Sequence, residues 1–208
     1  MVARVSDVSS GQAALVLRPL RVSDKEQAWQ AHEELARDDF DFLLDLKRRE
    51  AWPVYLARLE RLRQGVDLPE DRVPGTFLVA EVAGQIVGRV SIRHELNDYL
   101  AREGGHIGYG VRPGFRRRGY AGLILGQSLA FAATLGLERV LVTCDDDNVG
   151  SATVIERAGG VLENVVPGLD GSVDKRRYWV AVEPAAEAAA DSGADPGADA
   201  DAGAERLG

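Results

Sequence analysis

The chain has few of the features that would place it outside the cell or in a membrane. Its 208 residues include a single cysteine, Cys144, which excludes an internal disulfide bond and fits a reducing compartment. No segment approaches the ~20 apolar residues of a membrane span, and residues 1–13 have no apolar core of signal-peptide length. Lysine is scarce, with three against 22 arginines, and this bias with abundant alanine favours a GC-rich bacterial genome. We therefore expect a cytoplasmic bacterial protein without a membrane partner.

The last segment, residues 184–208, lacks aromatic and β-branched side chains. Ten alanines, six acids and one arginine give it a charge of −5, out of a formal net charge of −8 for the chain. Such a segment buries too little apolar surface to offset the entropy lost on ordering, and we expect it to be disordered. We expect the same of residues 1–13, which leaves one domain at 14–183. The acidic tail argues against nucleic acid as a partner, because it would compete with phosphates for a basic groove.

A basic turn at residues 111–123, VRPGFRRRGYAGL, separates a strand-like segment from a helix-like one. It holds four arginines in an otherwise acidic chain. Backbone N–H groups in the first turn of a helix have no partner within the helix, and the helix dipole favours negative charge there. Gly119 lets a ligand approach the backbone without a Cβ in the way. The turn therefore predicts a site for a phosphate-rich ligand. The four arginines are Arg112, Arg116, Arg117 and Arg118.

The glycine spacing excludes two common phosphate-binding motifs. Gly114 and Gly119 match the first half of a P-loop, but Tyr120 and Ala121 stand where Lys and Ser/Thr must contact phosphate and magnesium. The dinucleotide fingerprint also fails, because Pro113 occupies the place of its third glycine.

Two segments resemble the GNAT superfamily of N-acetyltransferases, which use acetyl-coenzyme A. The spacing Arg116-x-x-Gly119-x-Ala121 is similar to the (Q/R)-x-x-G-x-(G/A) pyrophosphate loop of that family. Further along, residues 148–159 resemble its N-x-x-(S/A)-x-x-(L/V/I)-x-E-(K/R)-x-G block. Asn148 and Ser151 are also a suitable N-cap and first turn of a helix, a role compatible with the other. The matched residues of the second block are Asn148, Ser151, Val154, Arg157 and Gly159.

The hydropathy pattern agrees with the fold that this resemblance implies, a mixed α/β sheet that is mostly antiparallel and flanked by helices, in the order β-αα-βββ-α-β-α-ββ. Ser23 is expected to cap the first helix, with Glu26 completing a capping box. A second helical region over 40–65 is expected to be broken by Pro53 and ended by Gly65. A hairpin over 76–96 is expected to turn near Gly84. Other expected strands are 15–20, 106–111 and 138–144.

The resemblance implies acetyl-CoA as co-substrate, lying between strands 106–111 and 138–144, and no metal. Gly108 and Gly110 weaken the first strand, and the usual reason is a bulge or a close backbone approach. If the strands separate there, free backbone groups can pair with the pantetheine arm. Gly122 and Gly126 are expected to let the following helix pack closely on the sheet. The expected cofactor-binding residues are Tyr109, Gly110, Val111, Arg116, Arg117, Arg118, Gly119, Tyr120, Ala121, Asn148 and Ser151.

Acetyl transfer to an amine needs a base, an oxyanion donor and an acid or polar group for the departing thiolate. The backbone N–H of Val111 is the expected oxyanion donor. His106 is the first candidate for the base, since an imidazole titrates near neutral pH, although it could also just begin a strand and hydrogen-bond locally. Glu95 and His94 are second candidates on the adjoining strand.

One position departs from the family pattern. Many members have a tyrosine after the aliphatic residue of the asparagine block as the acid for the thiolate, and here that position is Ile155. Tyr178 could serve instead, or the thiolate leaves without a dedicated acid. Cys144 could form an acyl-enzyme, but it ends a hydrophobic strand and is better explained as a buried structural residue. Direct transfer is therefore expected.

The acceptor is less well defined. Acidic residues between 33 and 41 lie in the region that, by resemblance, covers the acceptor site, and they could attract a cationic amine or form a solvated helix face. A polyamine-like or aminoglycoside-like molecule, an amino acid and a protein N-terminus all stay open, and a homodimer is compatible. Two other readings are a non-catalytic acyl-CoA sensor and a module whose basic turn binds an acidic protein. The acidic residues are Glu33, Glu34, Asp38, Asp39 and Asp41.

Overall fold

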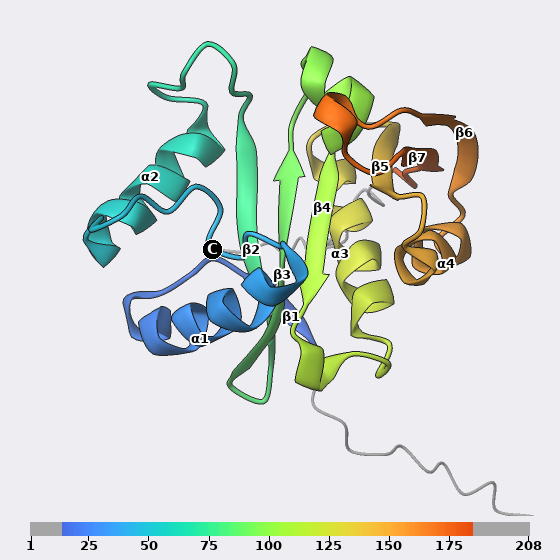
Figure 1. Cartoon of the computed structure of the whole chain (residues 1–208). Coiled ribbons are helices and arrows are strands. Elements are labelled where there is room, and N and C mark those ends of the chain that lie inside the picture. The colour runs from blue at the N-terminus through green and yellow to red at the C-terminus, as the bar shows by residue number, and fades with distance from the viewer. Residues whose placement is uncertain (1–13, 185–208) are drawn as a thin grey trace, which may run out of the picture.

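Residues 14–184 are described in the computed structural model of the chain. They form a seven-stranded sheet in the order β1-β2-β3-β4-β5-β7-β6 (Figure 1). Neighbouring strands in this sheet are antiparallel except β4 and β5, which are parallel. The strands are β1 (Val16–Arg18), β2 (Gly75–Val82), β3 (Gln85–Arg93), β4 (Ile107–Val111), β5 (Arg139–Asp145), β6 (Val161–Val166) and β7 (Lys175–Ala181). The α-helices are α1 (Lys25–Leu35), α2 (Trp52–Gln64), α3 (Tyr120–Thr134) and α4 (Val149–Arg157).

This element order confirms the mixed α/β fold expected from the sequence. The connector before β4 also contains a short π-helical turn, Leu100–Gly104, that the sequence pattern did not predict. The predictions of disorder for 1–13 and the tail concern segments outside the described residues, except for Pro184, and they stay predictions.

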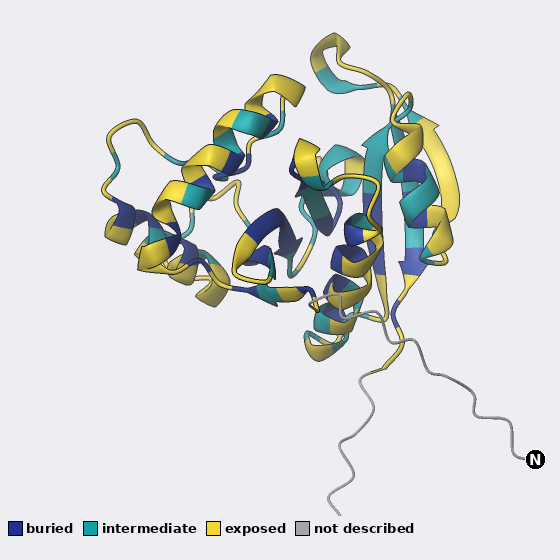
Figure 2. Ribbon diagram, turned by 90° about the horizontal axis from the view of Figure 1, so that it is seen from below, coloured by how far each residue is buried: buried dark blue, intermediate teal, exposed yellow. Residues whose placement is uncertain are grey.

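Helices cover both faces of the sheet, with α1 and α2 on one side and α3 and α4 on the other (Figure 1). Alternate residues of β2 therefore serve two different cores: Phe77 and Val79 pack against α1 and α2, whereas Leu78 faces α3. The buried residues accordingly gather between helices and sheet, and the outer helix faces are exposed (Figure 2). Because both faces are covered, the polar residues Arg89 and Ser91 of β3 are buried.

The hairpin between β2 and β3 has a two-residue turn. Ala83 and Gly84 both have positive φ, 49° and 77°, and Val82 pairs with Gln85. Turns of this kind match the twist of the flanking strands. The turn lies near the predicted Gly84-Gln85 position.

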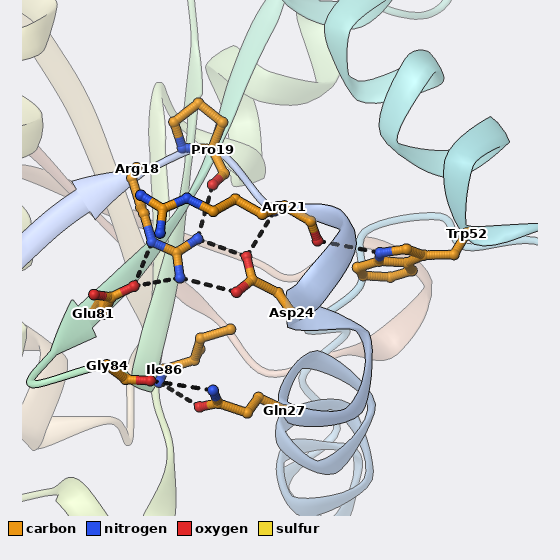
Figure 3. Close-up of polar contacts among 9 residues, drawn as sticks. All are labelled: Arg18, Pro19, Arg21, Asp24, Gln27, Trp52, Glu81, Gly84 and Ile86. Carbon is orange, nitrogen blue, oxygen red and sulfur yellow. Dashed lines mark hydrogen bonds and ion pairs between the residues drawn. The ribbon is translucent and has the colours of Figure 1, made fainter.

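The predicted capping box at Ser23 is wrong. The residue before α1 is Asp24, and its buried carboxylate binds Arg18 at 2.6 and 3.0 Å and accepts the Arg21 N–H at 2.7 Å (Figure 3). Glu81 of β2 binds the same guanidinium at 2.5 Å. Burial alone would raise the pKa of Asp24, but hydrogen bonds from Arg18 and Arg21 outweigh it and keep that pKa below its ordinary value. The carboxylate thus joins β1 and β2 to the start of α1 instead of capping the helix.

The second helical region is also shorter than predicted. Residues 40–50 form turns, and α2 begins around Pro53 instead of being broken by it. Proline is well suited to the first turn of a helix, where its missing N–H has no partner to lose. Gly65 ends α2 with a φ of 70°, as predicted. The Trp52 indole N–H donates to the Arg21 carbonyl at 3.2 Å, which links this start of α2 to that of α1 (Figure 3).

Candidate active site

The turn between β4 and α3 has the geometry of an anion-binding site. Gly119 is the N-cap residue of α3 with a φ of 81°, and the Leu123 N–H donates to its carbonyl. The N–H groups of Tyr120 and Ala121 have no partner within the helix and point out of its first turn. A Cβ at Gly119 would meet no atom within 4 Å, so the backbone at this position is open to a ligand.

A cavity of about 880 Å³ lies over this turn and extends along β4 to the start of α4. It brings together ten of the eleven cofactor-binding residues expected from the sequence. The exception is Arg118, whose guanidinium lies 5.6 Å from the centre of the Phe115 ring. Gly122 also lines the cavity, and both Gly122 and Gly126 are exposed, so the prediction that they pack against the sheet is wrong. The ten residues are Tyr109, Gly110, Val111, Arg116, Arg117, Gly119, Tyr120, Ala121, Asn148 and Ser151.

The arginines of the turn have different roles. Arg112 is buried and forms a bidentate pair with Glu34 of α1, with both contacts at 2.8 Å. Arg116 binds Asp38 at 2.5 Å and the Val111 carbonyl at 3.0 Å. Two of the acids that could have attracted an amine, Glu34 and Asp38, therefore hold the turn against α1 and the segment that follows it. Arg117 is exposed, lines the cavity, and forms no ion pair within residues 14–184.

β4 and β5 separate soon after they meet. Their one register pair in the described sheet is Ile107 with Val142, supported by the His106 N–H donating to the Leu141 carbonyl at 2.7 Å. Beyond this point the backbone groups of Tyr109 and the N–H of Val111 face the gap, since alternate residues of β4 bond to β3. The separation expected from the sequence is present.

A bulge is not the reason for the two glycines of β4, because the described β3–β4 pairing runs without a register shift. Side chains approach these positions instead. A Cβ on Gly110 would lie 2.6 Å from the Phe40 ring, and one on Gly108 would lie 2.9 Å from a terminal nitrogen of Arg93. The missing side chains thus make room for Phe40 and Arg93 against the strand.

A second, smaller cavity of about 300 Å³ adjoins the first. It lies between β3, β4 and the π-helical turn on one side and the ends of β5 and β7 on the other. Four residues line both cavities: Phe40, Tyr109, Asn148 and Ser151. No motif in the sequence pointed to this cavity, although the alternation that puts Arg89 and Arg93 on one face of β3 was a signal for it. Its charged residues are Arg89, Arg93, Glu103, Asp145 and Lys175.

Tyr109 stands where the two cavities meet. Its hydroxyl is buried and forms no hydrogen bond to any residue of the described range. Burial raises the pKa of Tyr109 to about 12, although the nearby Ser151 side chain acts in the opposite direction. The hydroxyl is therefore protonated at neutral pH and free to donate to a ligand in the gap.

His106 has a structural environment. Its Nδ1 accepts the Leu141 N–H at 2.9 Å, so the ring proton of the neutral form belongs on Nε2. Burial, with a smaller effect from Arg93, lowers the pKa of His106 to about 4. His106 is not among the described residues that line either cavity. These contacts favour the local role of closing the β4–β5 gap over that of a base.

The other catalytic candidates also lie away from the cavity linings. Glu95 is exposed in the connector after β3, and His94 contacts Thr76 through its Nε2 at 2.9 Å. The Tyr178 hydroxyl is 3.1 Å from a Glu156 oxygen, in the core beneath α4. Cys144 does line the smaller cavity, but burial raises the pKa of its thiol to about 11, which leaves little thiolate for an acyl-enzyme.

The comparisons with known proteins agree with this arrangement. A family model described as the acetyltransferase (GNAT) domain matches residues 14–161. The chain therefore belongs to the GNAT acetyltransferase family and is an acyltransferase. A curated acetyltransferase of Photorhabdus laumondii subsp. laumondii is 28% identical over 128 residues, which cover 58% of this chain and 79% of the relative.

Solved structures show the same fold. The Mycobacterium smegmatis RimJ in complex with CoA-disulfide superposes with a TM-score of 0.61 at 19% identity, over 81% of this chain and 82% of that one. The microcin C7 self-immunity acetyltransferase MccE, in complex with acetyl-CoA and AMP, gives a TM-score of 0.58 at 19% identity, over 81% and 92%. Within the described residues there is no helix that is both long and apolar enough to span a membrane, and no cluster of residues suited to a metal.

Proposed function

We propose that the protein transfers the acetyl group of acetyl-CoA to a primary amine by direct attack in a ternary complex. Membership of the GNAT family makes acetyl-CoA the acetyl donor. The observation that carries the rest of the proposal is the meeting of two cavities at Tyr109, Asn148 and Ser151, beside the gap between β4 and β5. A two-substrate reaction without an acyl-enzyme needs both substrates at one point, and this arrangement provides it.

The larger cavity takes the coenzyme. Its pyrophosphate binds the N–H groups at the start of α3 and the exposed guanidinium of Arg117. The pantetheine arm then follows β4 through the gap, where its amides take the place of the missing sheet partner and pair with the Val111 N–H and the Tyr109 carbonyl. Asn148 lines the other side of the gap. This course puts the thioester at the entrance of the smaller cavity.

The amine enters through the smaller cavity. Glu103 is its one carboxylate without an ion pair among the described residues, since Asp145 is paired with Lys175. Glu103 accepts the ammonium proton, and the amine nitrogen attacks the thioester carbon. The backbone N–H of Tyr109 stabilises the oxyanion in place of the Val111 N–H expected from the sequence, because Tyr109 borders both cavities whereas Val111 lines only the larger one. The carbon–sulfur bond then breaks, and the thiolate takes the proton of the Tyr109 hydroxyl. The acylated nitrogen loses its second proton in the same step, and that proton restores the Tyr109 hydroxyl. This tyrosine comes from β4 and supplies the acid that Ile155 on α4 cannot.

Coenzyme binding is tested by a thermal shift with acetyl-CoA. A ligand at 100 times its Kd adds about 2.7 kcal/mol to the free energy of unfolding. Gly119→Glu should remove the rise in Tm, because its carboxylate would stand where the pyrophosphate binds. Gly84→Glu is a matched control, since Gly84 also has positive φ, a Cβ added there would meet no atom within 4 Å, and the residue lies in the β2–β3 turn.

An equal response of both variants to acetyl-CoA would contradict the assignment of the coenzyme site. Acetyl-CoA binding without CoA release in the presence of any amine would instead favour the non-catalytic sensor.

A further inference from the structure

Two arginines of β3 reach the smaller cavity, and neither has an acidic partner. Arg89 is only 4% exposed, and Arg93 is half-buried. Neither side chain takes part in an ion pair within residues 14–184. Burying a charged group is costly unless an opposite charge compensates it. No acidic side chain of the described residues supplies that compensation by pairing with Arg89 or Arg93.

The contacts of Arg89 leave its charge uncompensated. Its two terminal nitrogens donate to backbone carbonyls, those of Gly108 at 3.2 Å and Asp41 at 2.7 Å. Its Nε has no hydrogen-bond partner among the described residues, and the guanidinium lies 4.3 Å from the centre of the Phe40 ring. Burial, with a smaller effect from the charge of Arg93, lowers the pKa of Arg89 to about 9, so that the group is still cationic at neutral pH.

The two guanidinium groups converge on Gly108. Arg89 donates to its carbonyl, and a Cβ at this glycine would be 2.9 Å from a terminal nitrogen of Arg93. The one hydrogen bond that the Arg93 guanidinium makes within the described chain is a long one, 3.4 Å to the Gly104 carbonyl. Two like charges thus lie close together at β4, and both guanidinium groups have N–H donors that no described residue accepts.

The cavity also has an acidic side. Asp145 is ion-paired with Lys175, and Glu103 accepts the backbone N–H of Leu169 while keeping its charge unpaired. The cavity therefore offers a carboxylate for an ammonium group and two arginines for an anion. A small molecule that has both groups is complementary to it.

We propose that the acceptor is an amine that also bears an anionic group, either a carboxylate, as in a free amino acid, or a phosphonate. Arg89 and Arg93 bind this anion. The inference rests on the proposed acetyl transfer and specifies its acceptor. It disfavours polyamines and aminoglycosides, which would bring more positive charge to the buried Arg89 and the half-buried Arg93. It also disfavours a protein N-terminus, whose carboxyl group is tied up in a peptide bond.

The test measures CoA release with matched acceptors. The panel contains the common amino acids, their amides, their decarboxylated amines, the corresponding aminophosphonates, and spermidine. We expect the highest kcat/KM with an amino acid or an aminophosphonate, and at least roughly a 10-fold loss with the matched amide or amine, because a lost hydrogen bond to a charged group costs about that much. The ratio of kcat/KM for an amino acid to kcat/KM for the corresponding aminophosphonate identifies the preferred anion.

Arg93→Gln tests the role of the arginine. It should raise KM for the preferred acceptor roughly 10- to 100-fold and leave the acetyl-CoA thermal shift unchanged. Without acceptor, its Tm should stay equal to or rise above that of the wild type, because the repulsion between two buried cations is relieved. Arg61→Gln, on the exposed face of α2, is the control for the loss of one surface charge.

Three results would overturn the inference. One is a higher kcat/KM with spermidine or with amino-acid amides than with amino acids. Another is an Arg93→Gln variant that has a lower Tm than the wild type and an equal loss of kcat/KM for all acceptors, as expected of a structural arginine. The third, acetyl-CoA binding with no CoA release for any amine, would remove the proposed acetyl transfer as well, and so it is distinguishable from the first two.

Discussion

At the scale of single residues, the proposed chemistry depends on two side chains that the sequence did not offer as catalytic groups. Tyr109 is buried, lacks a hydrogen-bond partner among the described residues and borders both cavities, whereas Glu103 is the unpaired carboxylate of the acceptor cavity. The sequence offered His106, Glu95 and Tyr178 for these tasks on grounds of position. Which side chains line a cavity depends on segments far apart in the chain, and sequence spacing does not contain that information.

Tyr109→Phe should lower kcat by about 10²-fold, the lower end of the range for general acid–base catalysis. The phenyl ring keeps the packing and removes the proton that the thiolate takes. The acetyl-CoA-dependent rise in Tm should be retained. Because burial raises the pKa of Tyr109 to about 12, the wild-type rate should not fall between pH 7 and 10 from loss of this proton. A kcat within about 2-fold of the wild type would mean that the thiolate leaves without this acid.

Glu103→Gln and Glu95→Gln form a matched pair of carboxylate removals. The first should reduce kcat by about 10²-fold, because it removes the proposed base while keeping an acceptor for the Leu169 N–H. The second should have little effect, since Glu95 is exposed and outside the cavity linings. Steady-state rates at saturating acetyl-CoA make the comparison. The opposite ranking would restore Glu95 as the base.

At the scale of helices and strands, the order of elements was predictable, whereas the details of their ends were not. The hydropathy pattern and the turn residues Gly65 and Gly84 correctly mark the end of α2 and the β2–β3 hairpin. Ser23 and Pro53 were misread because each has a local interpretation that distant contacts overrule. Asp24 forms an ion pair with the buried Arg18 of β1. Pro53 lies in the first turn of α2, and the neighbouring Trp52 donates to the Arg21 carbonyl, just before α1.

The junction of β4 and β5 gives a prediction on pH. His106 has a pKa of about 4 in the folded protein and about 6.5 when unfolded. The unfolded chain therefore binds the extra proton first, and the free energy of unfolding should fall as the pH drops from 6.5 towards 4, by on the order of 2 kcal/mol. His106→Gln lacks this titration and should show a flatter dependence of Tm on pH over that range. An unchanged slope in the variant would contradict the buried, neutral histidine.

At the scale of the whole molecule, the family motifs pointed to residues that line the larger cavity and to few that line the smaller one. The pyrophosphate turn is local, so its residues lie close together in sequence, and ten of the eleven expected residues line one cavity. The smaller cavity is assembled from β3, the connector before β4, and the ends of β5 and β7. Its composition supports the proposed anionic acceptor, because Glu34 and Asp38 bind arginines of the turn while Arg89 and Arg93 face the cavity.

Initial-rate kinetics with both substrates varied test the central claim most directly. The readout is the release of CoA with acetyl-CoA and the best amine of the panel. Direct transfer in a ternary complex predicts no release without the amine and double-reciprocal lines that intersect. Parallel lines would indicate an acyl-enzyme, for which Cys144 is the available nucleophile. The absence of amine-dependent release from a folded protein that binds acetyl-CoA would contradict the account.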